Sequence, residues 1–190
     1  MDKMTASRIT GGNTSFSRSA ADFYPTPDDV TEALIWAIKP EPETAVIWEP
    51  ACGDGRMLRC LERLGPYQAV GTDILTGDDF LSMGLPEGCN WIITNPPFSQ
   101  AEAFIRHAYA LNVPFAFLLK SQFWHAKKRY ELFMDCNPDY IFPLTWRPDF
   151  LFKERGGSSL MDVAWNVWLR RDCAHNTVYM PLERPKKETE

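Results

Sequence analysis

The fold is decided by one stretch, AVIWEPACGDG at residues 45–55. Ala45 to Trp48 is a short apolar run bounded by turn-forming residues, which predicts a central strand. The turn that follows contains Gly53 and Gly55, which let the backbone bend tightly and approach a ligand closely. Arg56 to Leu64 then shows a helical pattern. A strand, a glycine-rich turn and a helix in this order predict a nucleotide-binding unit.

The acids of this unit indicate which cofactor it would take. A nicotinamide-binding fingerprint requires a third glycine at position 58, where the chain has Leu58. Glu49 and Asp54 would repel a pyrophosphate, but they would attract the ammonium and sulfonium groups of S-adenosylmethionine. Asp73 follows the strand predicted over 67–72 and is twenty residues beyond the first glycine of the turn. An acid at this spacing is expected to bind ribose hydroxyls.

A second motif, TNPPF at residues 94–98, follows another apolar run that predicts a buried strand over 91–93. Its two prolines lack backbone N–H groups and have a fixed φ, so they form a stiff turn at the carboxyl end of the strand. Ligands of α/β sheets bind at this end of the strands. The turn presents one amide, Asn95, and one aromatic ring, Phe98. Alone, it would also fit a plain strand-ending turn with a surface aromatic.

Together the two motifs resemble those of the S-adenosylmethionine-dependent amino-methyltransferases, over roughly residues 22 to 170. The second is most similar to the fourth motif of the DNA N6-adenine enzymes, (Asn/Asp/Ser)-Pro-Pro-(Tyr/Phe/Trp). The resemblance implies a Rossmann-like class I methyltransferase fold. That fold has a seven-stranded, mostly parallel sheet with its last strand antiparallel and helices on both faces. The alternation of strand and helix patterns along the chain predicts the same α/β class.

The resemblance also implies how the cofactor is held. Tyr24 and Thr26 match by type a segment that closes over the methionine moiety, although Thr26 would equally be the N-cap of a helix beginning at Pro27. Asp79 matches an acid that accepts from the cofactor's adenine amino group, beside Phe80. The residues expected to bind S-adenosyl-L-methionine are Tyr24, Thr26, Glu49, Pro50, Ala51, Cys52, Gly53, Asp54, Gly55, Asp73, Ile74, Asp79, Phe80 and Asn95.

The expected catalytic residues are Asn95, Pro96, Pro97 and Phe98. The amino group of adenine is a poor nucleophile because its lone pair is delocalised into the ring. If Asn95 Oδ1 and the Pro96 carbonyl both accept from this group, they localise the lone pair and stabilise the positive charge that develops on nitrogen. This mechanism needs no metal and no covalent intermediate. The base must leave its stack, and Phe98 would then stack on it.

Two segments are candidates for contact with DNA. Residues 120–129 combine cations with aromatic rings beside a strand end, which suits a flexible or single-stranded nucleic acid. A solvated helix face with Trp124 as a core anchor is the alternative. Residues 143–159 form a long loop, and such loops are commonly functional. The expected substrate-binding residues are Phe98, Lys120, Trp124, Lys127, Lys128, Trp146, Arg147 and Phe150, with Trp146 or Phe150 facing Phe98 across the base.

Composition is that of one ordinary globular domain, with 45% hydrophobic and 24% charged residues in a chain of 190. We expect a flexible arm over 1–21, a methyltransferase domain over 22–180 and a tail over 181–190. Five cysteines without a Cys-x-x-Cys pair favour a reducing cytoplasm. We expect neither a metal site nor a membrane span. The net charge of −5 disfavours a phosphate backbone as partner, but a local cluster of cations can override that sum.

The function favoured by the residues and the resemblance is methyl transfer to N6 of adenine in DNA. N4-cytosine methylation uses the same turn chemistry, and the asparagine favours adenine. Similar Asn-Pro-Pro enzymes act on guanine in ribosomal RNA or on a glutamine amide of release factors, and Phe98 in place of tyrosine argues weakly against the glutamine enzymes. A cofactor-binding module without activity is a further alternative, against which the completeness of both motifs argues.

The length of the chain is similar to that of compact phage and prophage enzymes. Methyltransferases that read a defined DNA sequence usually carry a separate recognition domain, for which 190 residues leave no room. Specificity would therefore come from residues 120–129 and 143–159 or from a partner, or it would be low. The sequence does not indicate an oligomeric state.

Overall fold

A computed structural model describes residues 24–150, 161–169 and 176–186. The expected arm over 1–21 and the part of the long loop over 151–160 lie outside these residues. In chain order the described elements are α2 (Asp28–Ile38), β1 (Val46–Glu49), α3 (Arg56–Leu64), β2 (Gln68–Gly71), the 3-10 helices η1 (Ile74–Thr76) and η2 (Phe80–Ser82), β3 (Trp91–Thr94), α4 (Ala101–Leu111), β4 (Phe115–Lys120), η3 (Phe123–His125), η4 (Lys127–Arg129), α5 (Tyr130–Asp135), β5 (Tyr140–Pro143), β6 (Val163–Trp168) and β7 (Val178–Tyr179).

The strands form one seven-stranded sheet within the described residues, in the order β2-β1-β3-β4-β6-β5-β7. β1 is parallel to β2 and β3, and β3 is parallel to β4. β6 runs antiparallel to both of its neighbours, β4 and β5, whereas β7 is parallel to β5. The predicted α/β fold with a mostly parallel sheet is thus confirmed.

An antiparallel strand is present as expected, but it is not the last strand of the chain. The antiparallel strand is β6, and one more short strand follows it, because the chain returns to the free edge of β5. There Val178 N donates to Asp139 O at 2.8 Å and Met180 N donates to Ile141 O at 3.0 Å. β7 has only two residues, both exposed, and is too short to show a period-two pattern from which a strand could be predicted.

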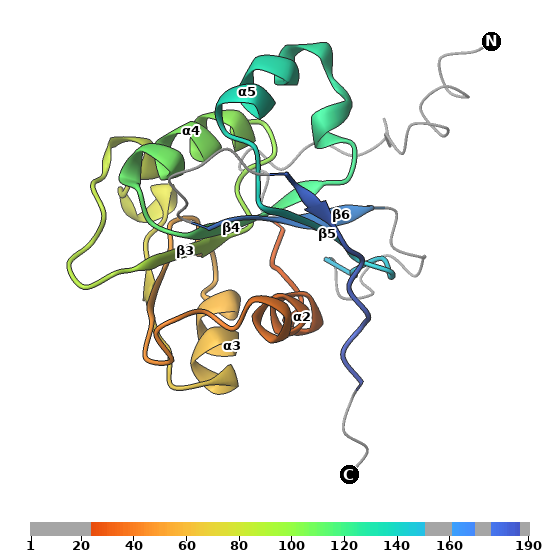
Figure 1. The fold of residues 1–190 in the computed structure, drawn as a ribbon. Coiled ribbons are helices and arrows are strands. Elements are labelled where there is room, and N and C mark those ends of the chain that lie inside the picture. The colour runs from red at the N-terminus through yellow and green to blue at the C-terminus, as the bar shows by residue number, and fades with distance from the viewer. Residues whose placement is uncertain (1–23, 151–160, 170–175, 187–190) are drawn as a thin grey trace, which may run out of the picture.

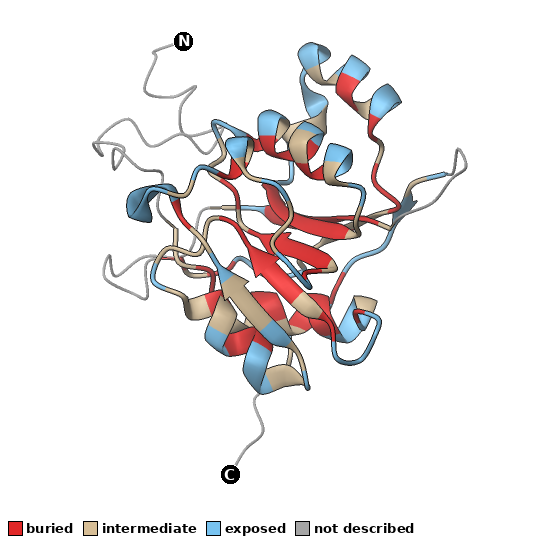
Figure 2. Cartoon of the chain, turned by 90° about the vertical axis from the view of Figure 1, so that its left-hand side faces the viewer, coloured by how far each residue is buried: buried red, intermediate tan, exposed pale blue. Residues whose placement is uncertain are grey.

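Helices cover both faces of the sheet, as expected. In Figure 1, α2 and α3 lie on one side of the strands, and α4 and α5 lie on the other. The alternation of side chains along β4 divides the core accordingly. Ala116 and Leu118 pack with the α2 and α3 side, while Phe115, Phe117 and Leu119 pack with the α4 side. Central strands buried on both faces read as continuous apolar runs, and Figure 2 shows them buried almost throughout.

Helix α2 is fixed to the body of the fold through its first turn. Asp28 Oδ1 accepts from Arg56 Nε of α3 at 2.7 Å, and Asp28 Oδ2 accepts from Arg63 at 3.2 Å. Burial alone would raise the pKa of Asp28, but hydrogen bonds and charge from the two arginines lower it below its ordinary value. Trp165 Nε1 of β6 donates to Val30 O at 2.9 Å. These contacts fix the position of the segment that precedes the helix.

Thr26 is not the N-cap of α2. The N-cap is Pro27, which makes no side-chain capping bond, and the helix begins one residue later than the capping pattern predicts. The side chain of Thr26 is buried instead. It lies in the wall of the cavity that is described below.

The connection between β2 and β3 contains no α-helix, only η1 and η2. Asp73 caps η1 by accepting from Leu75 N, and Asp79 caps η2 by accepting from Leu81 N. Ile74 and Leu75 are 61% and 71% exposed, respectively. The segment between β2 and β3 therefore consists of short helical turns, and it exposes apolar side chains to solvent.

Part of the predicted tail packs against the domain. Leu182 is buried and forms a bridge with Leu144, and Arg184 Nε pairs with Asp29 Oδ2 at 2.7 Å. The division into arm, domain and tail stays a prediction. No helix in the described part of the chain is both long enough and apolar enough to cross a membrane.

Candidate functional site

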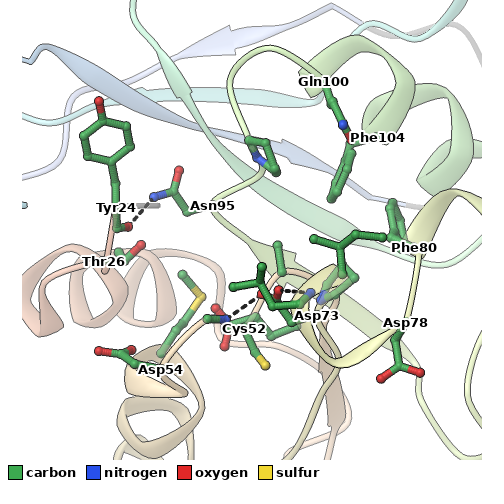
Figure 3. A pocket seen from close by; sticks show the side chains of 18 of the residues that line it. Tyr24, Thr26, Cys52, Asp54, Asp73, Asp78, Phe80, Asn95, Gln100 and Phe104 are labelled. Atoms are coloured by element: carbon green, nitrogen blue, oxygen red, sulfur yellow. Dashed lines mark hydrogen bonds between the residues drawn. The ribbon is translucent and has the colours of Figure 1, made fainter. Parts of the chain in front are cut away.

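A cavity of about 400 Å³ lies where β1, β2 and β3 end. Its wall is built by the segment before α2, the glycine turn, η1, η2, the proline turn and the start of α4 (Figure 3). The structure brings into this wall every predicted cofactor-binding residue except Gly55: Tyr24, Thr26, Glu49, Pro50, Ala51, Cys52, Gly53, Asp54, Asp73, Ile74, Asp79, Phe80 and Asn95. Residues from six places in the chain thus face one space.

The glycine turn has the backbone conformation that glycine favours. Gly53 and Gly55 have φ values of 52° and 73°, in the left-handed region that other residues rarely adopt. Gly55 does not line the cavity but is the N-cap of α3. Gly53 N donates to Asp73 Oδ2 at 2.8 Å, and this bond ties the turn after β1 to the end of β2.

The cavity wall is strongly acidic. Five carboxylates line it, those of Glu49, Asp54, Asp73, Asp78 and Asp79. Glu49 is 3% exposed, and its Oε2 has no hydrogen-bond partner among the described residues. Burial, followed by the charges of Asp54 and Asp73, raises the pKa of Glu49 well above its ordinary value of 4.5. A wall of this kind favours a ligand that carries positive charge.

Asp73 and Asp79 each use part of their acceptor capacity inside the protein. Asp73 accepts from Gly53 N and from Leu75 N, the latter at 2.9 Å, and Asp79 Oδ1 accepts from Leu81 N at 3.0 Å. An ionised carboxylate offers about four lone-pair positions. Both acids can therefore cap a turn and also accept from hydroxyl or amino groups of a ligand.

Phe80 has a larger structural role than its predicted contact with adenine requires. Its ring is 2% exposed and packs with Trp48 at 5.1 Å, Phe104 at 4.7 Å and His107 at 4.7 Å between ring centroids. It still forms part of the cavity wall, together with Phe104 from α4. The ring thus belongs both to the core under α4 and to the surface that a ligand would touch.

Asn95 is held in one orientation from the other side of the cavity. Its Nδ2 donates to Tyr24 O at 3.1 Å, across 71 positions of the sequence. This bond directs Oδ1 away from Tyr24, as Figure 3 shows. Oδ1 is buried and has no donor within the described residues. No group of the described residues donates to the Pro96 carbonyl either, whereas Pro97 O accepts from Gln100 N at 2.9 Å.

Four predicted substrate residues, among them Phe98, lie beside the cavity rather than in its wall. The centroid of the Phe98 ring is 5.9 Å from that of Tyr24, and Lys120 Nζ is 4.7 Å from the Phe98 centroid. Phe150 is buried, and its ring makes a T-shaped contact with Tyr24 at 6.1 Å between centroids. Trp146 is half-buried against the same core. Phe98 and Phe150 thus both contact the ring of Tyr24.

The remaining predicted substrate residues are farther along the chain. Trp124 packs edge-on against Phe123 and Phe133, and its Nε1 donates to Asn166 Oδ1 at 2.8 Å, so it anchors this segment to β6. Lys127 lines a second hollow of about 420 Å³ next to it, and Lys128 is exposed. Arg147 is exposed and pairs with Asp162 at 2.8 Å.

Sequence reasoning missed several residues of the cavity wall. Arg56 follows the glycine turn directly, which was a usable signal. The wall residues that were not predicted are Pro25, Arg56, Met57, Leu75, Asp78, Leu81, Ser99, Gln100 and Phe104. The described residues contain no group of three or more His, Cys, Asp or Glu side chains that could hold a metal ion.

The chain has the fold of the class I S-adenosylmethionine-dependent methyltransferases. It is similar to the methyltransferase subunit of a type I restriction-modification system from Streptococcus thermophilus, with a TM-score of 0.64 and 14% identity over 83% of this chain and 47% of that one. A chain of another type I restriction-modification system gives a TM-score of 0.54 and 15% identity, over 96% of this chain and 48% of that one.

The 23S rRNA methyltransferase ErmE gives a TM-score of 0.54 and 17% identity, over 77% of this chain and 70% of that one. This chain spans about half the length of the type I proteins that it matches. No protein-family model and no curated protein matches the sequence. At these identities the likeness establishes the fold.

Proposed function

We propose that this protein transfers the methyl group of S-adenosyl-L-methionine to the N6 amino group of adenine in DNA. One observation carries the proposal. Asn95 Oδ1 is buried beside an acidic cavity without a donor among the described residues, and the Nδ2 bond to Tyr24 O fixes its direction. A buried acceptor without a donor costs about 1–3 kcal/mol. An amino group of a bound substrate would remove that cost.

The cavity wall fits S-adenosyl-L-methionine. The unpartnered Glu49 Oε2 and the carboxylate of Asp54 suit its ammonium and sulfonium groups. Asp73 suits the ribose hydroxyls, and Asp79 suits the adenine amino group. When bound, the cofactor supplies a methyl group activated by the positive charge on sulfur. Tyr24, Thr26, Gly53, Ile74 and Phe80 would enclose it.

The proline turn prepares the acceptor. Asn95 Oδ1 and the Pro96 carbonyl can both accept from an exocyclic amine, which localises its lone pair on nitrogen. The same two oxygens stabilise the positive charge that builds as nitrogen attacks. Because Pro96 and Pro97 stiffen the turn and Tyr24 O holds the amide, the acceptors do not need to reorganise during the reaction.

The target base would stack on Phe98 after leaving the helix. Stacking of a base on an aromatic ring contributes about 1–3 kcal/mol. Lys120 lies against that ring, and the sequence from 120 to 129 contains four Lys and Arg residues, one His and no acid. We place the flanking phosphates along Lys120, Lys127 and Lys128, with Trp146, Arg147 and Phe150 on the loop side of the base. Trp124 holds this segment against β6 through its hydrogen bond to Asn166.

The names of three proteins of similar structure favour a nucleic-acid acceptor. Two are chains of type I restriction-modification systems, and one is a 23S rRNA methyltransferase. The restriction-modification proteins support DNA as the substrate. The rRNA methyltransferase makes RNA the alternative substrate that an experiment must exclude. Asparagine at the first position of the turn favours adenine over cytosine. The proposal includes a relationship to the compact methyltransferases of phages and prophages.

The test is transfer of labelled methyl from S-adenosyl-L-methionine to adenine-containing DNA, to RNA and to a release-factor protein in parallel. Analysis of the nucleosides should find the label in N6-methyladenine from DNA. Label in N4-methylcytosine, in RNA or in protein alone would contradict the proposed acceptor. Absence of cofactor binding in calorimetry would favour a module without activity. The Asn95→Ala variant is the control for contaminating methyltransferases.

A further inference from the structure

The cavity contains many more negative than positive groups. Five carboxylates line it, and Arg56 is the one Arg or Lys of the described residues in its wall. S-adenosyl-L-methionine carries a carboxylate at its amino-acid end in addition to its positive groups. A wall of acids that attracts the positive groups also repels this carboxylate. A cation at the place where the carboxylate lies would offset this repulsion.

We propose that Arg56 binds the carboxylate of S-adenosyl-L-methionine and that Asp28 is a positioning residue for the Arg56 guanidinium. The inference rests on the cofactor that is proposed above and adds the group that recognises its anionic end. Guanidinium is suited to this role because its planar fork of donors matches a carboxylate in two parallel hydrogen bonds.

Arg56 lies at the appropriate end of the cavity. Asp54 and Thr26 line one side of the cavity and Asp78 and Phe80 the other, with Cys52 between them (Figure 3). Arg56 N donates to Asp54 Oδ1 at 3.0 Å, which places Arg56 on the Thr26 side. The acids that suit the adenosine, Asp73 and Asp79, cap η1 and η2 on the opposite side. The amino-acid end of the cofactor would then extend toward Arg56.

The guanidinium of Arg56 is already oriented. Arg56 is the first residue of α3, and its Nε donates to Asp28 Oδ1 at 2.7 Å. This bond holds the plane of the guanidinium fork. Asp28 is itself held by Arg63 at 3.2 Å. The Arg56 side chain is 33% exposed, so it is reached by solvent and by ligands.

The same ion pair also joins α2 to α3, and a purely structural role is the competing explanation. The two roles differ in one measurable way. If Arg56 only joins the helices, its loss weakens every ligand of the cavity to a similar degree. If it binds the carboxylate, its loss weakens only ligands that carry a carboxylate.

The experiment is calorimetric titration of the free protein with S-adenosyl-L-methionine and with its decarboxylated analogue, which retains the sulfonium and the amine. Arg56→Gln should lower the affinity for the complete cofactor by about 10-fold to 100-fold, as expected for a hydrogen bond between charged groups. Its affinity for the decarboxylated analogue should change by less than about threefold. Asp28→Asn should show a smaller loss with the same dependence on the carboxylate.

Arg63→Gln is the matched control, because Arg63 shares Asp28 but does not line the cavity. It should leave the ratio of the two affinities unchanged. Thermal unfolding without ligand checks that each variant is folded, and Arg56→Lys, which keeps the charge but loses the fork, serves if Arg56→Gln is unstable. Equal effects on both ligands, or none on either, would overturn the inference. Failure of the wild-type protein to bind S-adenosyl-L-methionine would instead overturn the proposed function and this inference with it.

Discussion

Replacement of Asn95 by alanine tests the proposed mechanism at its centre. The change removes one hydrogen bond, from Nδ2 to Tyr24 O at 3.1 Å, and also removes a buried oxygen that has no donor among the described residues. The lost bond costs about 0.5–1.5 kcal/mol, whereas removal of the unpartnered acceptor gains about 1–3 kcal/mol. The net effect on stability should therefore lie between a loss of about 0.5 kcal/mol and a gain of about 2.5 kcal/mol.

The effect on catalysis should be much larger. Loss of one preorganised group that faces charge developing in the transition state typically costs about 10²-fold to 10³-fold in kcat. The assay is single-turnover methyl transfer to DNA at saturating cofactor, with cofactor affinity measured separately by calorimetry. We expect the rate of methyl transfer to fall by about this factor. The affinity for the cofactor should change by less than about threefold, because the acidic side chains of the cavity wall that bind the cofactor are unchanged.

Thr94→Val is the matched control for this variant. Thr94 precedes Asn95 and is fully buried, and its Oγ1 also lacks a partner among the described residues, but it does not line the cavity. The valine variant should be as stable as the wild type or more stable, with transfer changed by less than about threefold. If Asn95→Ala retained more than about a tenth of the wild-type rate, or if Thr94→Val lost as much, the role given to the amide would be refuted.

Three further predictions concern the cavity, the fold and the DNA surface. The raised pKa of Glu49 means that its carboxyl group keeps a proton above pH 4.5, and a bound cation would displace that proton. The affinity for the cofactor should therefore rise as the pH rises through this pKa, and calorimetry in two buffers should detect the released proton. Glu49→Gln should abolish both the pH dependence and the proton release. In Gly71→Ala the new Cβ would lie 2.4 Å from Leu58 Cδ1, so denaturant unfolding should show a loss of about 1–3 kcal/mol. The loss should shrink when Leu58→Ala is added, and an undiminished loss would contradict the steric cause. The double variant Lys127→Gln and Lys128→Gln should weaken DNA binding and lower the salt slope of log K by about 2, and an unchanged slope would exclude both side chains as phosphate contacts.

The sequence was informative where local chemistry determines the structure. The helical pattern that follows Gly53 and Gly55 predicted α3 with the observed bounds, Arg56–Leu64. The apolar runs of the central strands were equally clear because both faces are buried. β7 was missed because two residues are too few to show a periodicity, and the strand is held by backbone bonds to β5. Thr26 fitted a capping pattern, but tertiary packing buries it in the cavity wall.

The candidate site shows the same division. The acids and glycines that follow β1 and β2 were visible as a pattern, because the carboxyl ends of parallel strands meet at one edge. The bond between Asn95 and Tyr24 joins positions 71 residues apart, and no local rule predicts it. Gln100 and Phe104 enter the wall because the proline turn places the start of α4 over the cavity, which depends on the angle of that turn.

The bond from Asn95 to Tyr24 also has a kinetic consequence. The segment that begins at Tyr24 encloses the proposed methyl donor and at the same time orients the amide that receives the acceptor base. The two binding events therefore share one wall. We expect a compulsory order of addition in which the donor enters first, because the segment that encloses it also supplies the backbone oxygen that orients the amide for the base. A DNA complex formed without donor would then be unproductive, and methylated DNA would leave before the spent donor.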